Sequence, residues 1–220
     1  MGTVVFDFDS TLVPCESLAE ALARAPGVDA AARREIDEIT RAGMEGAISF
    51  HESLTARLAL ARPTRAAVTA LGAELAGRLS RGARELVADL HARGHEVWIV
   101  SGAFVETLLP AARALRVPET RVIGLRAQWA PGGAFEGLAP DDPSAHAKED
   151  AVRGVAARWP RPVVGVGDGA TDLALRDAGF VEHFVAYCEH ARRPPVVDAR
   201  GVHVAADMDE AARILGRLLP

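Results

Sequence analysis

The residues best suited to chemistry in this chain begin with a pair of aspartates near its start. Asp7 and Asp9 lie two residues apart, directly after the apolar run Val4–Phe6. Two close carboxylates repel one another unless a cation lies between them, so the pair indicates a hard metal bound through oxygen. A carboxylate can also attack phosphorus and form an aspartyl-phosphate. A solvated turn at the end of a strand would explain the same two residues, so the pattern alone leaves both interpretations open.

Two further positions could hold a phosphate group. Ser101-Gly102 follows the apolar run Val97–Val100 and precedes a helical pattern. Helix N-termini offer free N–H groups to anions, although an ordinary N-cap serine would look the same. Lys148 lies early in a helical pattern over residues 145–159, where a cation opposes the helix dipole. That unfavourable placement indicates a functional role for Lys148, while a solvated surface lysine remains the default interpretation of any single lysine.

A glycine-rich stretch supplies two more carboxylates. Residues 165–172 read Gly-Val-Gly-Asp-Gly-Ala-Thr-Asp, which places Asp168 and Asp172 beside a tight turn. The spacing differs from GxGxxG, and no GxxxxGK[ST] segment occurs in the chain. The stretch therefore indicates metal-binding carboxylates and favours neither a dinucleotide fingerprint nor a P-loop.

These residues are expected to be positioned by a parallel sheet. Val4–Phe6, Val97–Val100 and Val163–Val166 read as buried strands, and helical patterns follow the last two at residues 104–115 and 171–178. That alternation predicts an α/β fold. Because ligands of such sheets bind at the carboxyl ends of the strands, the motifs at these three ends are expected to meet in one site.

The connection from the first strand to Val97 is far longer than a crossover requires. It runs to about ninety residues, whereas a minimal crossover takes about a dozen. We predict a doubly wound parallel sheet with a helical cap domain inserted after the first strand, the core comprising residues 1–13 and 80–220 and the cap residues 14–79. Extra helices packed on a sheet face would explain the same length. The predicted cap helices are Glu16–Ala25, Asp29–Ala42, Ile48–Ala61 and Thr64–Leu79, and Arg84–Arg93 is expected to lead back into the sheet.

The second half of the chain predicts a hairpin, two further strands and a closing helix. A Pro131-Gly132-Gly133 turn is typical of a β-hairpin. The predicted elements are the hairpin strands Val122–Trp129 and Ala134–Leu138, the strands Phe184–Tyr187 and Val202–Ala205, and the helix Met208–Leu219.

Composition argues against several classes of protein. The formal charge is −5, from 25 basic and 30 acidic side chains, so the whole protein attracts neither nucleic acid nor an anionic membrane. Two cysteines are too few for a disulfide framework. No signal peptide or membrane-spanning run is apparent. We expect a cytoplasmic protein that binds neither nucleic acid nor membrane, and the sequence does not indicate its oligomeric state.

In combination, these segments resemble the haloacid dehalogenase (HAD) superfamily of phosphohydrolases. Its four motifs appear in order as DFDST (Asp7–Thr11), Ser101-Gly102, Lys148 and GDGATD (Gly167–Asp172), and the resemblance covers nearly the whole chain. Within the superfamily, the DFDSTLVPCES start and the MEGAISFHESLTAR segment from Met44 to Arg57 are most similar to the phosphoserine phosphatase family. The resemblance implies a HAD-like Rossmannoid core.

The resemblance also implies roles for the acidic residues. Asp7 would be the nucleophile, and Asp9 would first protonate the leaving oxygen and then activate water. Mg²⁺ would be held by the Asp7 carboxylate, the Asp9 backbone carbonyl and Asp168, with Asp172 in support.

The remaining implied residues bind a small phosphomonoester. Ser101 and Lys148 would hold the phosphoryl oxygens. Glu16 would pair with a substrate ammonium and Arg57 with a substrate carboxylate, the match expected for O-phospho-L-serine. Met44 and Phe50 would close over the ligand, and Gly102 and Thr171 complete the expected contacts.

Some positions depart from the family pattern. Ala103 replaces the second glycine of the common SGGF, and the segment after Gly179 matches poorly. The substrate could therefore be another phosphomonoester, such as phosphothreonine, phosphoethanolamine or phosphocholine. The same residues would also suit a phosphotransferase. A non-catalytic phosphate-binding protein is a further alternative, but Asp7, Asp9, Lys148 and Asp168 argue against it, because a pure binder needs neither a nucleophile nor an acid.

Overall fold

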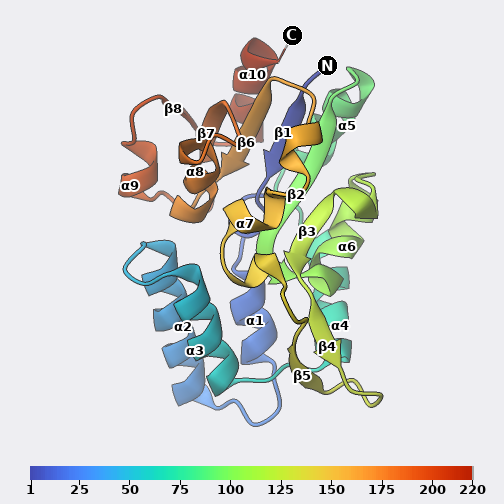
Figure 1. The fold of residues 1–220 in the computed structure, drawn as a ribbon, viewed down its shortest axis with the longest axis vertical. Coiled ribbons are helices and arrows are strands. Elements are labelled where there is room, and N and C mark those ends of the chain that lie inside the picture. The colour runs from blue at the N-terminus through green and yellow to red at the C-terminus, as the bar shows by residue number, and fades with distance from the viewer. Residues whose placement is uncertain (220) are drawn as a thin grey trace.

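The computed structural model describes residues 1–219 of the 220-residue chain. Six parallel strands form one sheet in the order β3-β2-β1-β6-β7-β8 (Figure 1). β1 lies between β2 and β6, so the carboxyl ends of these three strands are neighbours, as predicted. The strands are β1 (Thr3–Phe6), β2 (Glu96–Phe104), β3 (Val122–Leu125), β6 (Val163–Gly167), β7 (His183–Tyr187) and β8 (Val202–Ala205).

Helices cover both faces of this sheet. Val4 and Phe6 point to one face and Val5 to the other, since side chains alternate along a strand. The first face packs against α5 (Ala83–Ala92), α6 (Val105–Ala114) and α10 (Met208–Leu218), and the second against α7 (Lys148–Val152) and α8 (Ala170–Asp177). A short helix, α9 (Pro194–Val197), contacts α8 and β8. The predicted doubly wound fold is confirmed.

A helical insert follows β1, as predicted, and comprises α1 (Ser17–Ala23), α2 (Ala30–Met44), α3 (Phe50–Leu60) and α4 (Arg65–Ala76) before α5. The α2 and α3 helices lie side by side beyond the carboxyl ends of the strands, whereas α4 packs against α6 (Figure 1). Side-chain caps start three of these helices, at Asp29, Ser49 and Thr64. The cap boundaries at residues 14 and 79 stay predictions.

The predicted hairpin is wrong in its first arm. Residues 122–129 divide at Arg126, so that β3 joins the main sheet and β4 (Ala127–Trp129) alone pairs with β5 (Phe135–Leu138). The Asp142 carboxylate accepts the Arg126 N–H at 2.7 Å, which removes that group from any strand pairing.

The helix predicted over residues 145–159 is also wrong in its length. It divides into a 3₁₀ turn (Pro143–Ala145), the five-residue α7 and a second 3₁₀ turn (Ala156–Arg158). Gly154, which disfavours helix, lies at the second break. Lys148 is nevertheless the first residue of α7, early in a helix as expected. Over residues 1–219, no helix combines the length and apolar character that crossing a membrane requires.

Candidate active site

A small cavity of about 50 Å³ lies where the ends of β1 and β2 meet the helical insert. The residues that line it come from both parts of the fold, which brings most of the predicted site together. Ten of the twelve predicted residues line it: Asp7, Asp9, Glu16, Met44, Phe50, Arg57, Ser101, Gly102, Lys148 and Thr171. Leu18, Thr40, Gly43 and Ser53 also line the cavity, and no pattern in the sequence indicated them.

A tight turn after β1 separates the two N-terminal aspartates. The N–H groups of Leu12 and Val13 both donate to the Phe8 carbonyl, and Ser10 adopts the left-handed region with φ of 50°. This turn keeps the Asp9 carboxylate apart from the cluster that the Asp7 carboxylate joins. The two residues are therefore placed for different tasks.

The other two predicted carboxylates, Asp168 and Asp172, lie with Asp7. One oxygen from each of the three lies within 4.8 Å of the others, and all three side chains are buried. Gly167 permits this approach, because a Cβ there would lie 2.5 Å from the Asp172 Cγ. Asp168 Oδ1 is buried and has no hydrogen-bond partner in the described chain. Three carboxylates with an unpartnered oxygen fit a hard divalent cation.

One ammonium group lies within this cluster. Lys148 Nζ contacts both Asp7 Oδ1 and Asp172 Oδ1. Burial lowers the pKa of Lys148, but the charges of Asp172 and Asp7 outweigh it and raise the pKa overall. Lys148 therefore remains a cation within the carboxylate cluster, and because it also lines the cavity it can hold a phosphoryl oxygen.

Burial and mutual repulsion raise the pKa values of the clustered carboxyl groups. Burial, followed by the charge of Asp172, raises the pKa of Asp7 well above its ordinary value. The same two causes raise the pKa of Asp168 to about 7. A divalent cation between these groups would hold them ionised, because it supplies the missing opposite charge.

Asp9 has the environment of a proton donor. Its Oδ1 is buried and has no hydrogen-bond partner among residues 1–219. Burial, followed by the negative charge of Glu16, raises the pKa of Asp9 to about 8. A carboxyl group with this pKa is protonated near neutral pH, as a general acid must be.

The insert contributes a buried guanidinium. Arg57 is 5% exposed, and its Nε donates to the Ser53 carbonyl at 3.1 Å. Its Nη1 donates to Thr40 Oγ1 at 3.4 Å, and no carboxylate of residues 1–219 lies within ion-pair distance. Burial lowers the pKa of Arg57 to about 10, so it remains charged. A buried cation that lines a cavity and has no ion-pair partner within residues 1–219 is suited to bind an anion.

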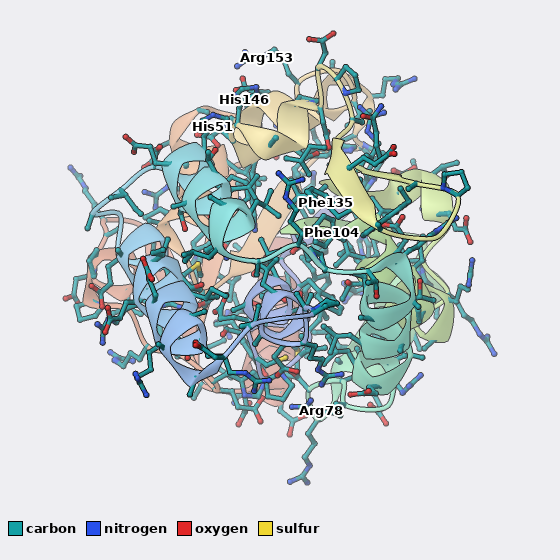
Figure 2. The ribbon with its side chains drawn as sticks, turned by 90° about the horizontal axis from the view of Figure 1, so that it is seen from below. His51, Arg78, Phe104, Phe135, His146 and Arg153 are labelled. Carbon is teal, nitrogen blue, oxygen red and sulfur yellow. The ribbon has the colours of Figure 1, made fainter. Side chains whose placement is uncertain are left out.

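Apolar side chains of the insert close the cavity. The Phe50 ring rests on Gly102, where a Cβ would lie 2.6 Å from the ring. Beside this contact, the imidazoles of His51 on α3 and His146 before α7 stack with their centroids 4.8 Å apart (Figure 2). His51 Nδ1 also lies 3.0 Å from the Ala145 carbonyl oxygen. The insert therefore contacts the core through both Phe50 and His51.

The expectation that Ser101 opens a helix is wrong. β2 continues to Phe104 with an irregular register after Val100, and α6 begins at Val105. Ser101 Oγ accepts a hydrogen bond from the Ala103 N–H at 3.2 Å, a local contact within this irregular strand end. Ser101 still lines the cavity, but it does not lie at the N-terminus of a helix, so no helix dipole is directed at a phosphate there.

A residue that the sequence did not indicate lies behind the carboxylates. Arg193 Nε donates to Asp168 Oδ2 at 2.7 Å, and its Nη2 lies 3.4 Å from Glu16 Oε1. The same Glu16 oxygen accepts a hydrogen bond from Ser10 Oγ at 2.9 Å. Arg193 directly precedes Pro194 and Pro195, which is the one local signal that its position is fixed.

The comparisons with known proteins agree with this geometry. The haloacid dehalogenase-like hydrolase family matches residues 4–177. Phosphoserine phosphatase of Mus musculus is 36% identical over 173 residues, which cover 77% of this chain and 75% of the mouse protein. Phosphoserine phosphatase of Halobacterium salinarum is 34% identical over 220 residues, covering 98% of this chain and 97% of that protein.

Solved structures give the same result. A phosphoserine phosphohydrolase-like protein from Francisella tularensis superposes with a TM-score of 0.89 at 34% identity, covering 98% of this chain and 100% of that one. A substrate-bound phosphoserine phosphatase gives 0.76 at 25% identity, with 97% of each chain covered. A phosphoserine phosphatase with an analogue of its phospho-aspartyl intermediate gives 0.73 at 26%, covering 97% of this chain and 98% of that one. The chain belongs to the haloacid dehalogenase-like hydrolases, and within them it is similar to the phosphoserine phosphatases.

Proposed function

We propose that this protein is a Mg²⁺-dependent phosphomonoester hydrolase that converts O-phospho-L-serine to L-serine through an aspartyl-phosphate. The observation that supports this substrate is the cavity itself, which is lined by Asp7, Glu16 and a buried Arg57 that has no ion-pair partner within residues 1–219. A phosphoamino acid presents a phosphate, a carboxylate and an ammonium, and each meets an opposite charge there. The relatives named as phosphoserine phosphatases support this substrate.

In the first step of this mechanism, the Asp7 carboxylate attacks phosphorus. The bond to the seryl oxygen breaks, and Asp9 donates its proton to that oxygen, consistent with its raised pKa. Lys148 and Ser101, which line the same cavity, hold the phosphoryl oxygens as negative charge builds on them. In the second step, Asp9 takes a proton from a water molecule as the water oxygen attacks phosphorus. The bond from phosphorus to the Asp7 carboxylate breaks, and phosphate is released.

The clustered carboxylates would hold the metal ion. Asp7 and Asp168 would bind it together with the Asp9 backbone carbonyl, and Asp172 would support them. When bound, Mg²⁺ neutralises charge on the phosphoryl group and on the attacking carboxylate.

The insert recognises the amino acid end of the substrate. The Arg57 guanidinium binds the carboxylate through two parallel N–H bonds, and Glu16 binds the ammonium. Met44 and Phe50 line the same cavity and exclude water from the aspartyl-phosphate.

The proposal is tested by measuring phosphate release with Mg²⁺ for phosphoserine, for phosphoethanolamine, which lacks the carboxylate, and for an aryl phosphate. In Arg57→Gln, kcat/KM for phosphoserine should fall at least about 30-fold, since losing one partner of a buried charge pair costs about 2 kcal/mol or more. Phosphoethanolamine should change little. Arg62→Gln is the matched control, because Arg62 is an exposed arginine of the insert.

Two results would contradict the proposal. Turnover of phosphoserine no faster than that of the aryl phosphate would refute the substrate. An equal loss on phosphoserine and phosphoethanolamine in Arg57→Gln would refute the binding of the carboxylate by Arg57.

A further inference from the structure

Arg193 joins two carboxylates of the site without lining the cavity between them. Its Nε donates to Asp168 Oδ2 at 2.7 Å, and its Nη2 contacts Glu16 Oε1 at 3.4 Å. Asp168 belongs to the core and Glu16 stands at the start of the insert, immediately before α1. Glu16 lines the cavity, whereas Arg193 does not. Arg193 instead lines a neighbouring pocket that Glu16 also lines. Arg193 therefore acts on the site only through these carboxylates.

The chain holds Arg193 in a fixed position. It is the residue before α9, with φ of −110° and ψ of 107°, and it precedes Pro194. A residue before proline is restricted to extended conformations, so this backbone has little freedom to change. The side chain is 18% exposed, and both of its ion pairs run to partly or fully buried carboxylates. Its guanidinium is consequently preorganised.

Arg193 holds one oxygen of each carboxylate and leaves the other oxygen available. At Asp168, Oδ2 is bound, whereas Oδ1 is buried and unpartnered within residues 1–219. At Glu16, Oε1 accepts hydrogen bonds from Arg193 Nη2 at 3.4 Å and from the Ser10 hydroxyl at 2.9 Å, and Oε2 has no hydrogen-bond partner in the described chain. A planar guanidinium is suited to this task because its donors are fixed relative to one another.

We propose that Arg193 is a positioning residue that orients Asp168 for the metal ion and Glu16 for the substrate ammonium. The inference rests on the proposed function, since it names what fixes two groups of that site. Arg193 leaves Asp168 Oδ1 as the oxygen available to the cation, and Glu16 Oε2 as the oxygen available to the ammonium.

Two possible roles of Arg193 predict opposite changes in cation affinity when Arg193 is removed. If Arg193 were only a nearby positive charge, its removal would strengthen cation binding, because it repels a divalent ion. If it positions Asp168, its removal weakens cation binding, typically by about 10- to 100-fold for residues that orient metal ligands. Metal affinity measured without substrate therefore separates these roles.

The experiment titrates Mn²⁺ into metal-free protein and measures free Mn²⁺ by electron paramagnetic resonance. Arg193→Gln should raise the dissociation constant at least about tenfold. Arg193→Lys, which retains the charge but lacks the planar fork, should also raise it severalfold. The matched control is Arg192→Gln, since Arg192 is the exposed neighbour, and it should stay within about twofold of the wild type.

Unchanged or tighter Mn²⁺ binding in Arg193→Gln would overturn the proposal, and so would wild-type affinity in Arg193→Lys. Thermal unfolding of each variant shows whether the protein titrated is folded, and Arg193→Lys serves as the folded variant if Arg193→Gln is not. No substrate is present in this assay. A failure to hydrolyse phosphoserine would thus overturn the proposed function alone, whereas unchanged Mn²⁺ affinity would overturn the positioning role alone.

Discussion

The contact between Gly102 and Phe50 offers a direct test of whether the insert must close on the core for activity. A Cβ on Gly102 would lie 2.6 Å from Cε2 and 2.7 Å from Cζ of the Phe50 ring. Ordinary contact begins near 3.4 Å, so Gly102→Ala must push the ring out by 3.4 − 2.6 = 0.8 Å. Phe50 is the first residue of α3, so displacing its ring pushes on the start of the helix that covers the cavity.

The expected magnitude follows from the cost of overpacking. Inserting a methyl group into a packed contact costs about 1–3 kcal/mol. If this cost falls on closure, kcat/KM for phosphoserine decreases roughly 5- to 150-fold, because each 1.4 kcal/mol corresponds to about a factor of ten. Steady-state phosphate release with Mg²⁺ measures it.

Two companion variants make the Gly102→Ala result interpretable. Gly154→Ala is the matched control, since nothing lies within 4 Å of a Cβ added there. Adding Phe50→Leu to Gly102→Ala removes the ring atoms that clash and should restore part of the lost activity. Activity of Gly102→Ala within about twofold of the wild type, or a double variant worse than both single variants, would refute the reasoning.

Two further predictions concern ionisable groups of the site. We expect kcat/KM to fall as the pH rises through about 8, because Asp9 is protonated below its raised pKa and cannot donate a proton above it; a flat pH–rate profile between about pH 7 and 9.5 would contradict the acid role. Lys148, the only lysine of the chain, contacts two of the three clustered carboxylates. Lys148→Met should lower kcat at least about 100-fold, yet keep or raise Mn²⁺ affinity because a competing cation is gone. Loss of Mn²⁺ binding together with activity would show that Lys148 instead holds the carboxylates in place.

The sequence predicted the core of the site because its chemistry is local. Asp7 and Asp168 each lie at or directly after the end of a short apolar strand, and parallel strands bring such ends to one edge of a sheet. Lys148 was singled out because a cation at the start of a helix is unfavourable unless something nearby needs it. Each of these arguments uses only a few neighbouring residues.

The features that the sequence did not predict depend on contacts between distant segments. Ser80, where the chain leaves the insert, hydrogen-bonds through Oγ to the Thr11 carbonyl and to His190 Nε2, both at 2.7 Å. His190 and Arg193 come from the segment after β7, which matches the family pattern poorly. Their roles arise because this segment returns to the point where the insert begins, and no local pattern encodes that return.

The structure shows which oxygen of each clustered carboxylate is engaged by a neighbouring group and which is not. Asp172 has both oxygens engaged, one by Lys148 and the other by the Gly169 N–H at 2.9 Å, so a supporting role suits it better than direct attack or primary metal binding. At Asp7, Oδ1 is engaged by Lys148, whereas Oδ2 has no hydrogen-bond partner within the described chain. Asp168 has Oδ2 held by Arg193 and Oδ1 unpartnered within the described chain. All three residues are buried aspartates, and the cations and N–H groups around them leave a different set of oxygens available on each.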